Sequence, residues 1–355
     1  MTMSQATIKD VTTVPRIAHG EAMQIAAAEN ARFAALLRSF EPGDWAKPTD
    51  CTLWDARAVA AHIVGSAAGQ ASPREFARQV RKGRPLIAEI GGQYWWDGMN
   101  QLQIRERAGL STGQLITEWN LASARALRAR TRLPRPIAML PLLSLPAPVG
   151  RQPLSYLFDI GFTRDVWMHR IDLARATGKT LDQDPGHDGR IVADIVAEWA
   201  GTHGEPFTLS LDGPAGGQYR SGTGGEHVDL DAIEFCRILS GRGEGTGILR
   251  HPQPLKPGHL TPGPDLLNPQ RSAPWTPRQT RSPRESTGSP PSCPASARPA
   301  SLSTSTSSTT SSRCFSIPGT GLPSRYSPRP SPRSPRLTGS AGSPSAMSKP
   351  TSAGP

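Results

Sequence analysis

The chain changes character abruptly near residue 251, and this change limits which part of it can fold. Of the 36 prolines among the 355 residues, 22 lie in residues 251–355, beside the run SLSTSTSSTTSS and repeated Ser-Pro and Arg-Pro pairs. Apolar periodicity stops there, and such a composition cannot bury enough surface to offset chain entropy. We therefore predict a disordered tail over residues 251–355. It is either an inert extension or the product of reading a GC-rich gene in the wrong frame.

The same division removes the case for a nucleic-acid partner. The whole chain has a formal net charge of +11, but residues 251–355 hold 12 basic and 2 acidic residues. The first 250 residues hold 28 basic and 27 acidic residues, so they are nearly neutral. A nearly neutral folded part lacks the basic surface that nucleic-acid binders use. We expect no nucleic-acid partner.

Cysteine usage and hydropathy indicate the compartment. Cys51, Cys236, Cys293 and Cys314 are sparse and form neither a disulfide scaffold nor a CxxC metal site. The chain has no apolar run of transmembrane length, and its N-terminus lacks a basic-then-apolar signal pattern. The sequence therefore predicts a cytoplasmic protein with no membrane partner.

Residues 20–178 show helical periodicity. A capping-box pattern, Thr52 with Asp55, predicts a helix that starts near Leu53. Four long helices with such connections predict a bundle, in which metal sites are commonly built from inward side chains. The expected helices cover residues 20–40, a stretch that starts near residue 53, 73–83, 94–131 with a break at 109–113, and about 154–177, with a proline-rich crossover over 133–153.

The pattern changes after Gly178. A helix is expected over residues 188–203, and PFTLSLDG alternates as a half-buried strand does. A second short strand is expected near Gln218–Arg220, and VDLDAIEFCRILSGR predicts a helix that ends at Gly241. These elements indicate a small α+β domain over residues 179–250. Residues 1–19 are polar and irregular, so we expect a flexible arm there.

The strongest chemical motif is TRDVWMHRIDLARATG, residues 163–178. Asp165 and His169 are four residues apart, so on a helix they lie one above the other on the same face. Asp172 follows three residues later and shares that face. Such a stack of acid and imidazole can hold a metal ion, or it can form an ion pair. Asp172 is placed to support His169 or to make an ion pair of its own.

A second histidine lies upstream in a different predicted helix. His62 sits among Ala58, Ala61 and Gly65, small residues that let another helix approach closely. By itself His62 is either a satisfied core histidine or a metal ligand. Its presence strengthens the metal interpretation of Asp165 and His169.

Four blocks resemble, in the same order, the mycothiol-dependent maleylpyruvate isomerase family. They are DWAKPTDCTLWDARAVAAHIVG, DGMNQLQIRERAG, RDVWMHRIDLARATG and EFCRILSGRGEGTG, within residues 20–250. The resemblance implies a fold of class α plus a small α+β domain. It implies a DinB-like four-helix bundle that binds metal, over residues 20–178, followed by a sterol-carrier-like C-terminal domain.

The resemblance also implies a set of site residues. In that family a divalent metal, usually zinc, is held at positions that here are His62, Asp165 and His169. Asp165 stands where the isomerase has glutamate, which is one methylene longer. We therefore expect either that the helix lies closer to the metal or that a water intervenes. The family places a functional arginine in the C-terminal domain. Arg237 and Arg242 are the candidates, with surface helix charges as the alternative.

These residue types suit a thiol-dependent reaction. Two imidazoles and one carboxylate leave an open position on zinc, where an entering thiol would be deprotonated. The thiolate could add to an activated double bond and leave after rotation, or it could stay attached. The first outcome is a cis–trans isomerisation and the second a thiol transfer. No cysteine here has a motif partner, so the thiol would come from a cofactor, which the resemblance implies is mycothiol. The substrate would be a small electrophile.

Two other classes of function stay open. The chain could be a non-catalytic binding or regulatory module that a metal stabilises, although it lacks the histidine-plus-CxxC pattern of zinc anti-sigma factors. It could also be a metal-dependent hydrolase that uses bound water. Metal analysis, with a screen of electrophiles with and without a small thiol, separates these classes.

Overall fold

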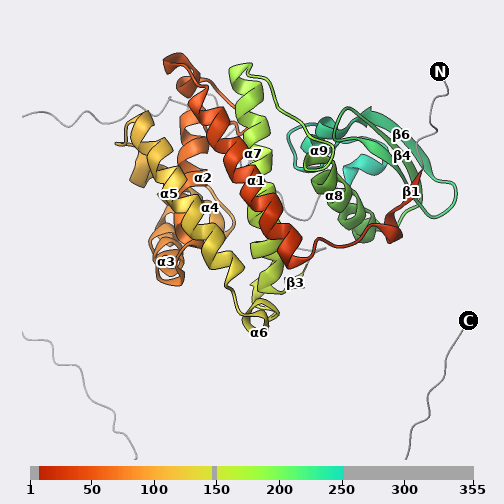
Figure 1. Ribbon diagram of the computed structural model, residues 1–355, viewed down its shortest axis with the longest axis horizontal. Helices are drawn as coiled ribbons and strands as arrows, with labels where there is room; N and C mark the ends of the chain where they lie inside the picture. Colours follow the sequence, from red (N-terminus) through yellow and green to blue (C-terminus); the bar gives the residue numbers. More distant parts are fainter. Residues whose placement is uncertain (1–7, 146–149, 252–355) are drawn as a thin grey trace, which may run out of the picture. The chain divides into compact units, whose positions relative to one another are not determined.

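The computed structural model describes residues 8–145 and 150–251, which are rich in helices and include a small mixed sheet (Figure 1). The predicted tail lies outside the described residues, apart from His251. No helix within the described ranges is long and apolar enough to cross a membrane.

Four long helices contact one another in a ring. They are α1 (His19–Arg38), α2 (Ala56–Gln70), α5 (Thr112–Thr131) and α7 (Phe162–Thr177). The contacts run from α1 to α5, from α5 to α2, from α2 to α7 and from α7 back to α1. Their buried side chains form one apolar cluster, which includes Phe33, Trp119 and Leu173. Two further helices, α3 (Pro73–Glu89) and α4 (Trp95–Arg107), pack together and against α2.

Two predicted helix boundaries are wrong, for local reasons. The helix expected near Leu53 begins at Ala56, because the side chain of Asp55 accepts a hydrogen bond from the Ala58 amide at 2.8 Å and is itself the N-cap. The helix expected to end at Gly83 continues to Glu89. Gly83 permits close packing instead, since a Cβ there would lie 2.6 Å from the backbone nitrogen of Met99 on α4.

Other boundaries are confirmed. The break expected over residues 109–113 separates α4 from α5, and Ser111 caps α5. The helix α7 stops at Gly178, which has a φ of 70°. The proline-rich crossover contains a one-turn helix and a two-stranded pairing, and a π-helical segment precedes α7. These elements are α6 (Arg135–Ala138), β2 (Leu143–Ser144), β3 (Arg151–Gln152) and η3 (Tyr156–Gly161).

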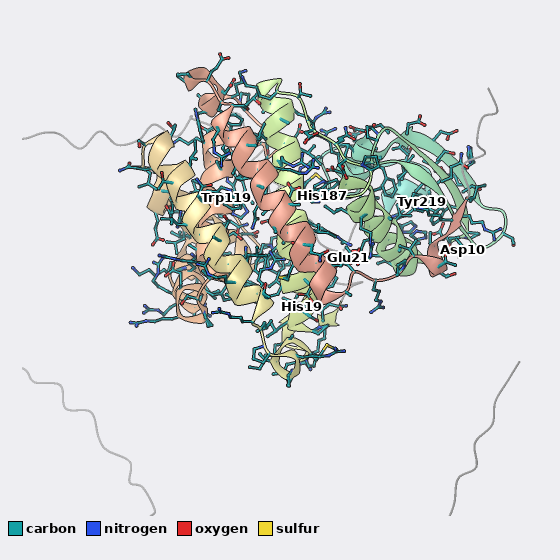
Figure 2. All side chains as sticks on the ribbon, in the orientation of Figure 1. Asp10, His19, Glu21, Trp119, His187 and Tyr219 are labelled. Carbon is teal, nitrogen blue, oxygen red and sulfur yellow. The ribbon has the colours of Figure 1, made fainter. Side chains whose placement is uncertain are left out.

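A four-stranded sheet has the order β1-β5-β4-β6. Its strands are β1 (Lys9–Asp10), β4 (Phe207–Asp212), β5 (Gly217–Ser221) and β6 (Glu226–Asp231). Strands β4 and β5 are antiparallel, whereas β1 with β5 and β4 with β6 are parallel. The helices α8 (Asp188–His203) and α9 (Ala232–Leu239) share a second apolar cluster with the sheet. Tyr219, labelled in Figure 2, belongs to this cluster.

Two sequence expectations differ from this sheet. The stretch VDLD, expected to begin a helix, completes β6; the helix starts only at Ala232, because the Asp231 side chain caps α9. Within the stretch expected to be a flexible arm, Lys9 and Asp10 pair with Tyr219 and Arg220 of β5, and Val11 is buried. Three short 3-10 turns complete the described elements, at Val11–Thr13, Pro42–Ala46 and Gly247–Arg250.

Candidate metal centre

The three residues expected as ligands come together. His62 lies in the middle of α2, and Asp165 and His169 lie on successive turns of α7. Their candidate ligand atoms all lie within 4.8 Å of one another. The Nε2 atom of His62 is 3.4 Å from Oδ2 of Asp165, and Nε2 of His169 is 3.5 Å from Oδ1. Both histidines are buried, while the Asp165 side chain is 19% exposed.

The other ring nitrogen of His62 is held by α4. Nδ1 of His62 lies 2.9 Å from Oε1 of Gln103. The close approach of α4 to α2 depends on Gly65, because a Cβ there would lie 2.5 Å from Cβ of Gln103. The small-residue face that the sequence shows around His62 thus admits a helix, as expected. His62 is only half satisfied, however, since its Nε2 has no hydrogen-bond partner.

His169 is held through a buried ion pair. Its Nδ1 lies 2.9 Å from Oδ2 of Asp172, which is fully buried. Arg242 binds both oxygens of Asp172, with Nε at 2.5 Å and Nη2 at 2.6 Å. Burial opposes ionisation, but Arg242 and His169 hold the pKa of the Asp172 carboxyl well below its ordinary value. Asp172 is therefore an anionic acceptor, and Nδ1 of His169 carries the proton.

The Nε2 atom of His169 consequently faces Asp165 with a bare lone pair, and Nε2 of His62 faces the same carboxylate. Burial lowers the pKa of His169, which favours the neutral ring. Among the buried side-chain nitrogens of the described residues, Nε2 of His62 and of His169 have no hydrogen-bond partner. A lone pair that faces a carboxylate is repelled by it, and buried polar atoms without partners are rare. A cation between the three residues removes the repulsion.

The spacing of the three residues is compatible with a shared metal ion. The distances of 3.4 and 3.5 Å exceed those of protein hydrogen bonds. Two ligands at the usual distances from a tetrahedral zinc ion lie roughly 3.3 Å apart. The Asp165 carboxylate lies close to both histidines, at 3.4 and 3.5 Å.

Cys51 lies beside this centre. Its Sγ is 3.6 Å from Oδ2 of Asp172 and 3.8 Å from Nδ1 of His169, which makes a second group of potential ligands. Arg242 already neutralises Asp172, and its Nη2 lies 3.7 Å from Sγ. Burial, followed by the charge of Asp172, raises the pKa of the Cys51 thiol far above its ordinary value. Without a metal, Cys51 is therefore a neutral thiol that packs beside His169 and Asp172.

Both arginines expected in the C-terminal part are buried, so the interpretation as surface charges is wrong. Arg242 reaches the histidine cluster through Asp172. Arg237 does not: it binds Glu234 at 2.5 Å and Asp50 at 3.0 Å, and it donates to the Arg242 carbonyl at 3.3 Å. Arg237 therefore holds the turn that carries Arg242.

Sequence reasoning did not find Cys51, Trp54 or Gln103 at this centre. Trp54 forms a wall, with its ring 5.2 Å from that of His62 and 6.2 Å from that of His169. Cys51 and Trp54 do lie in the first sequence block that resembles the isomerase family. Gln103 lies in the second block, DGMNQLQIRERAG. Their position within these two blocks was the one sequence feature that could have indicated that they lie near the candidate ligands.

The comparisons with known proteins agree with the resemblance read from the sequence. Residues 26–174, which contain all three expected ligands, match the family described as mycothiol maleylpyruvate isomerase N-terminal domain. Two solved structures are similar, those of a mycothiol-dependent maleylpyruvate isomerase and of a histidine-to-alanine mutant of that enzyme. They have 18% and 17% identity, cover 66% of this chain and 93% of those chains, and have TM-scores of 0.44. No curated protein matches the sequence.

Proposed function

We propose that this chain, which resembles the mycothiol-dependent maleylpyruvate isomerase family, is a metal-dependent and thiol-dependent enzyme. It acts on a small electrophile, either isomerising a double bond or transferring the thiol. Mycothiol is the thiol that the family match suggests.

One observation carries the proposal. The buried Nε2 atoms of His62 and His169 have no hydrogen-bond partner, and the Asp165 carboxylate lies between them at 3.4 and 3.5 Å. Two neutral imidazoles and a carboxylate are the donor set of many catalytic zinc sites. His62, Asp165 and His169 would hold the ion. When bound, the ion would supply the positive charge that keeps a small thiol deprotonated at neutral pH.

The chain's own residues would bind and orient the reactants. Asp165 is the partly exposed ligand, so thiol and substrate would enter from its side. Trp54 would keep water from the histidine rings. Nη1 of Arg242 is buried and has no partner, which makes it the candidate donor to an anionic group of the substrate. Arg237 would act behind it, by fixing the Arg242 backbone.

The proposal extends to the family's architecture. The ring of α1, α2, α5 and α7 suits a DinB-like bundle over residues 20–178. The sheet with α8 and α9 would be the sterol-carrier-like unit over residues 179–250, with β1 as an added edge strand.

The test combines metal analysis with turnover. The purified protein should contain about one divalent ion per chain, and a maleyl-type substrate should react only when mycothiol or another small thiol is present. The same assay with other electrophiles separates isomerisation from thiol transfer by its products. A metal-loaded protein that shows no thiol-dependent reaction would favour the non-catalytic binding module. Absence of metal binding would overturn the proposal as a whole.

A further inference from the structure

We infer that Gln79 and Gln103 form a relay that decides which ring nitrogen of His62 carries the proton. Both are positioning residues: neither side chain is a candidate ligand, and Gln79 acts only through Gln103. The inference deepens the proposed function, since it explains why His62 presents Nε2 to Asp165. The evidence for the relay consists of hydrogen bonds within the chain and does not depend on a bound metal.

The orientation of the Gln79 amide is fixed by its two acceptors, which are the Gly65 carbonyl and the Glu75 carboxylate. The Gln79 amide nitrogen donates to the Gly65 carbonyl at 3.0 Å and to Oε1 of Glu75 at 3.0 Å. A backbone carbonyl can only accept. Glu75 is also an acceptor, because its hydrogen bonds to Arg78 hold the pKa of its carboxyl below the ordinary value. Both protons of the Gln79 amide are therefore committed, and its oxygen must face Gln103.

The orientation of the Gln79 amide determines that of the Gln103 amide, and through it the position of the proton on His62. Nε2 of Gln103 lies 2.8 Å from Oε1 of Gln79 and donates to it. The oxygen of Gln103 is then left facing Nδ1 of His62 at 2.9 Å. An amide oxygen has no proton to give, so Nδ1 must donate. A flip of either glutamine would bring two oxygens or two NH₂ groups together, so the network allows one arrangement.

Two glycines of α2 make room for the relay. A Cβ at Gly65 would lie 2.5 Å from Cβ of Gln103, and a Cβ at Gly69 would lie 2.9 Å from Oε1 of Gln79. Gln79 and Gln103 are both fully buried, so solvent does not compete for these hydrogen bonds. His62, Gly65 and Gly69 thus lie on the side of α2 that faces α3 and α4. The two glycines leave the space that the Gln103 and Gln79 side chains occupy.

The relay has a consequence for ligand binding. A neutral imidazole carries its proton on either nitrogen, and only the form with the proton on Nδ1 offers a lone pair from Nε2. By holding His62 in that form, Gln79 and Gln103 prepare it before any ligand arrives. Partners of this kind typically change metal affinity 10- to 100-fold when they are removed.

The experiment reads the proton directly and uses metal-free protein first. Nitrogen-15 NMR of the imidazole rings should show His62 with its proton on Nδ1. Gln103→Leu and Gln79→Leu should give a mixture of the two forms or the opposite one. Gly69→Ala is a milder variant that displaces the Gln79 oxygen. Gln70→Leu is the matched control, because Gln70 is a buried glutamine on α2 that donates only to Ser66, at 3.1 Å.

Zinc titration of the same proteins follows. We expect the Kd for Zn²⁺ to rise about 10- to 100-fold in Gln103→Leu and by about tenfold in Gln79→Leu. The double variant should be no weaker than Gln103→Leu alone, because both residues act on one hydrogen bond. The Gln70→Leu control should match the wild type in proton position and in Kd.

The outcomes separate the relay from the proposed function. A wild-type His62 with its proton on Nε2 would overturn the relay, and so would an unchanged proton position in Gln79→Leu. A wild-type protein with the proton on Nδ1 that binds no Zn²⁺ would support the relay and overturn the proposed function.

Discussion

Two buried clusters meet on α7 through neighbouring residues, and they are built in opposite ways. His169 belongs to the candidate metal centre. Arg170 belongs to a network in which its Nε lies 2.6 Å from Glu29 and its Nη2 lies 2.7 Å from Asp188. His187, labelled in Figure 2, completes that network with a contact of 2.8 Å to Glu29.

The difference lies in which polar atoms have partners. Every buried side-chain polar atom of Glu29, Arg170 and Asp188 has a hydrogen-bond partner, whereas two histidine nitrogens of the metal centre have none. An unsatisfied buried polar group costs about 1–3 kcal/mol. The buried charged groups of Glu29, Arg170 and Asp188 are therefore satisfied, whereas the histidine cluster carries the cost of unpaired polar atoms. Burial of charged groups does not by itself identify a functional site, and unpaired buried atoms also occur elsewhere in the described residues, as at Arg130 and His203. What sets the histidine cluster apart is that two such atoms lie beside one carboxylate.

The largest expected effect is on the Arg170 network. Arg170→Met leaves Glu29 and Asp188 as buried anions without that guanidinium, so the free energy of unfolding should fall by about 3–5 kcal/mol. Urea unfolding of the metal-free protein measures this. The Zn²⁺ affinity of the folded variant should stay that of the wild type. A loss below about 1 kcal/mol, or a parallel loss of affinity, would break the comparison.

The next effect is on the histidine cluster. His62→Ala or His169→Ala should weaken Zn²⁺ binding by more than about 100-fold, because even an outer partner typically contributes 10- to 100-fold. Competition with a chelating dye gives the Kd, and metal analysis gives the stoichiometry. Stoichiometric metal retained by both variants would exclude the site. Arg170→Met serves as the control for general damage to α7.

A smaller effect should appear with pH. Burial lowers the pKa of His169 below its ordinary value, so the unfolded chain takes up a proton near pH 6.5 while the folded chain does not. The metal-free protein should therefore lose up to about 1.4 kcal/mol of stability per pH unit as the pH falls below 6.5. Urea unfolding at pH 7.5 and 5.5 tests this. His169→Gln should show a smaller decline, and an equal decline would assign the effect elsewhere.

The smallest effect is expected from lengthening the acid. Asp165→Glu adds one methylene at the partly exposed ligand, so the Kd for Zn²⁺ should change by less than about tenfold. Turnover of a maleyl-type substrate should persist or rise. Asp165→Asn should weaken binding more than Asp165→Glu but less than either histidine variant, since an amide oxygen coordinates without charge. Loss of metal from Asp165→Glu equal to that of His62→Ala would show that the shorter acid is essential.

The sequence was informative where function depends on local spacing. Asp165 and His169 share a face because they are four residues apart, and Gly178 ends their helix as expected. That His62 lies beside these two residues was only a hypothesis, because the contact between α2 and α7 follows from helix packing and not from hydrophobic periodicity. The family resemblance supplied that step.

The residues that hold the candidate ligands in place could not be predicted from local sequence patterns. Arg242 reaches Asp172 across 70 positions, and Gln79 reaches Gly65 from a different helix. Such contacts depend on how helices dock, which hydrophobic periodicity does not encode. The two residues of β1 are likewise too short for an alternation signal, so the N-terminal stretch looked like a free arm.

The pairing of β1 with β5 ties the start of the described chain to a strand made much later. Lys9 leaves the ribosome before every described α-helix, yet its partner Tyr219 follows all of these helices except α9. The edge of the sheet therefore closes late in synthesis, with a sequence separation that slows folding. The link from Thr13 to His19 is anchored as well, because Val14 and Ile17 pack against the apolar cluster of the sheet and Arg190 donates to the Pro15 carbonyl. The first residues of the described chain are therefore held by segments that are synthesised last.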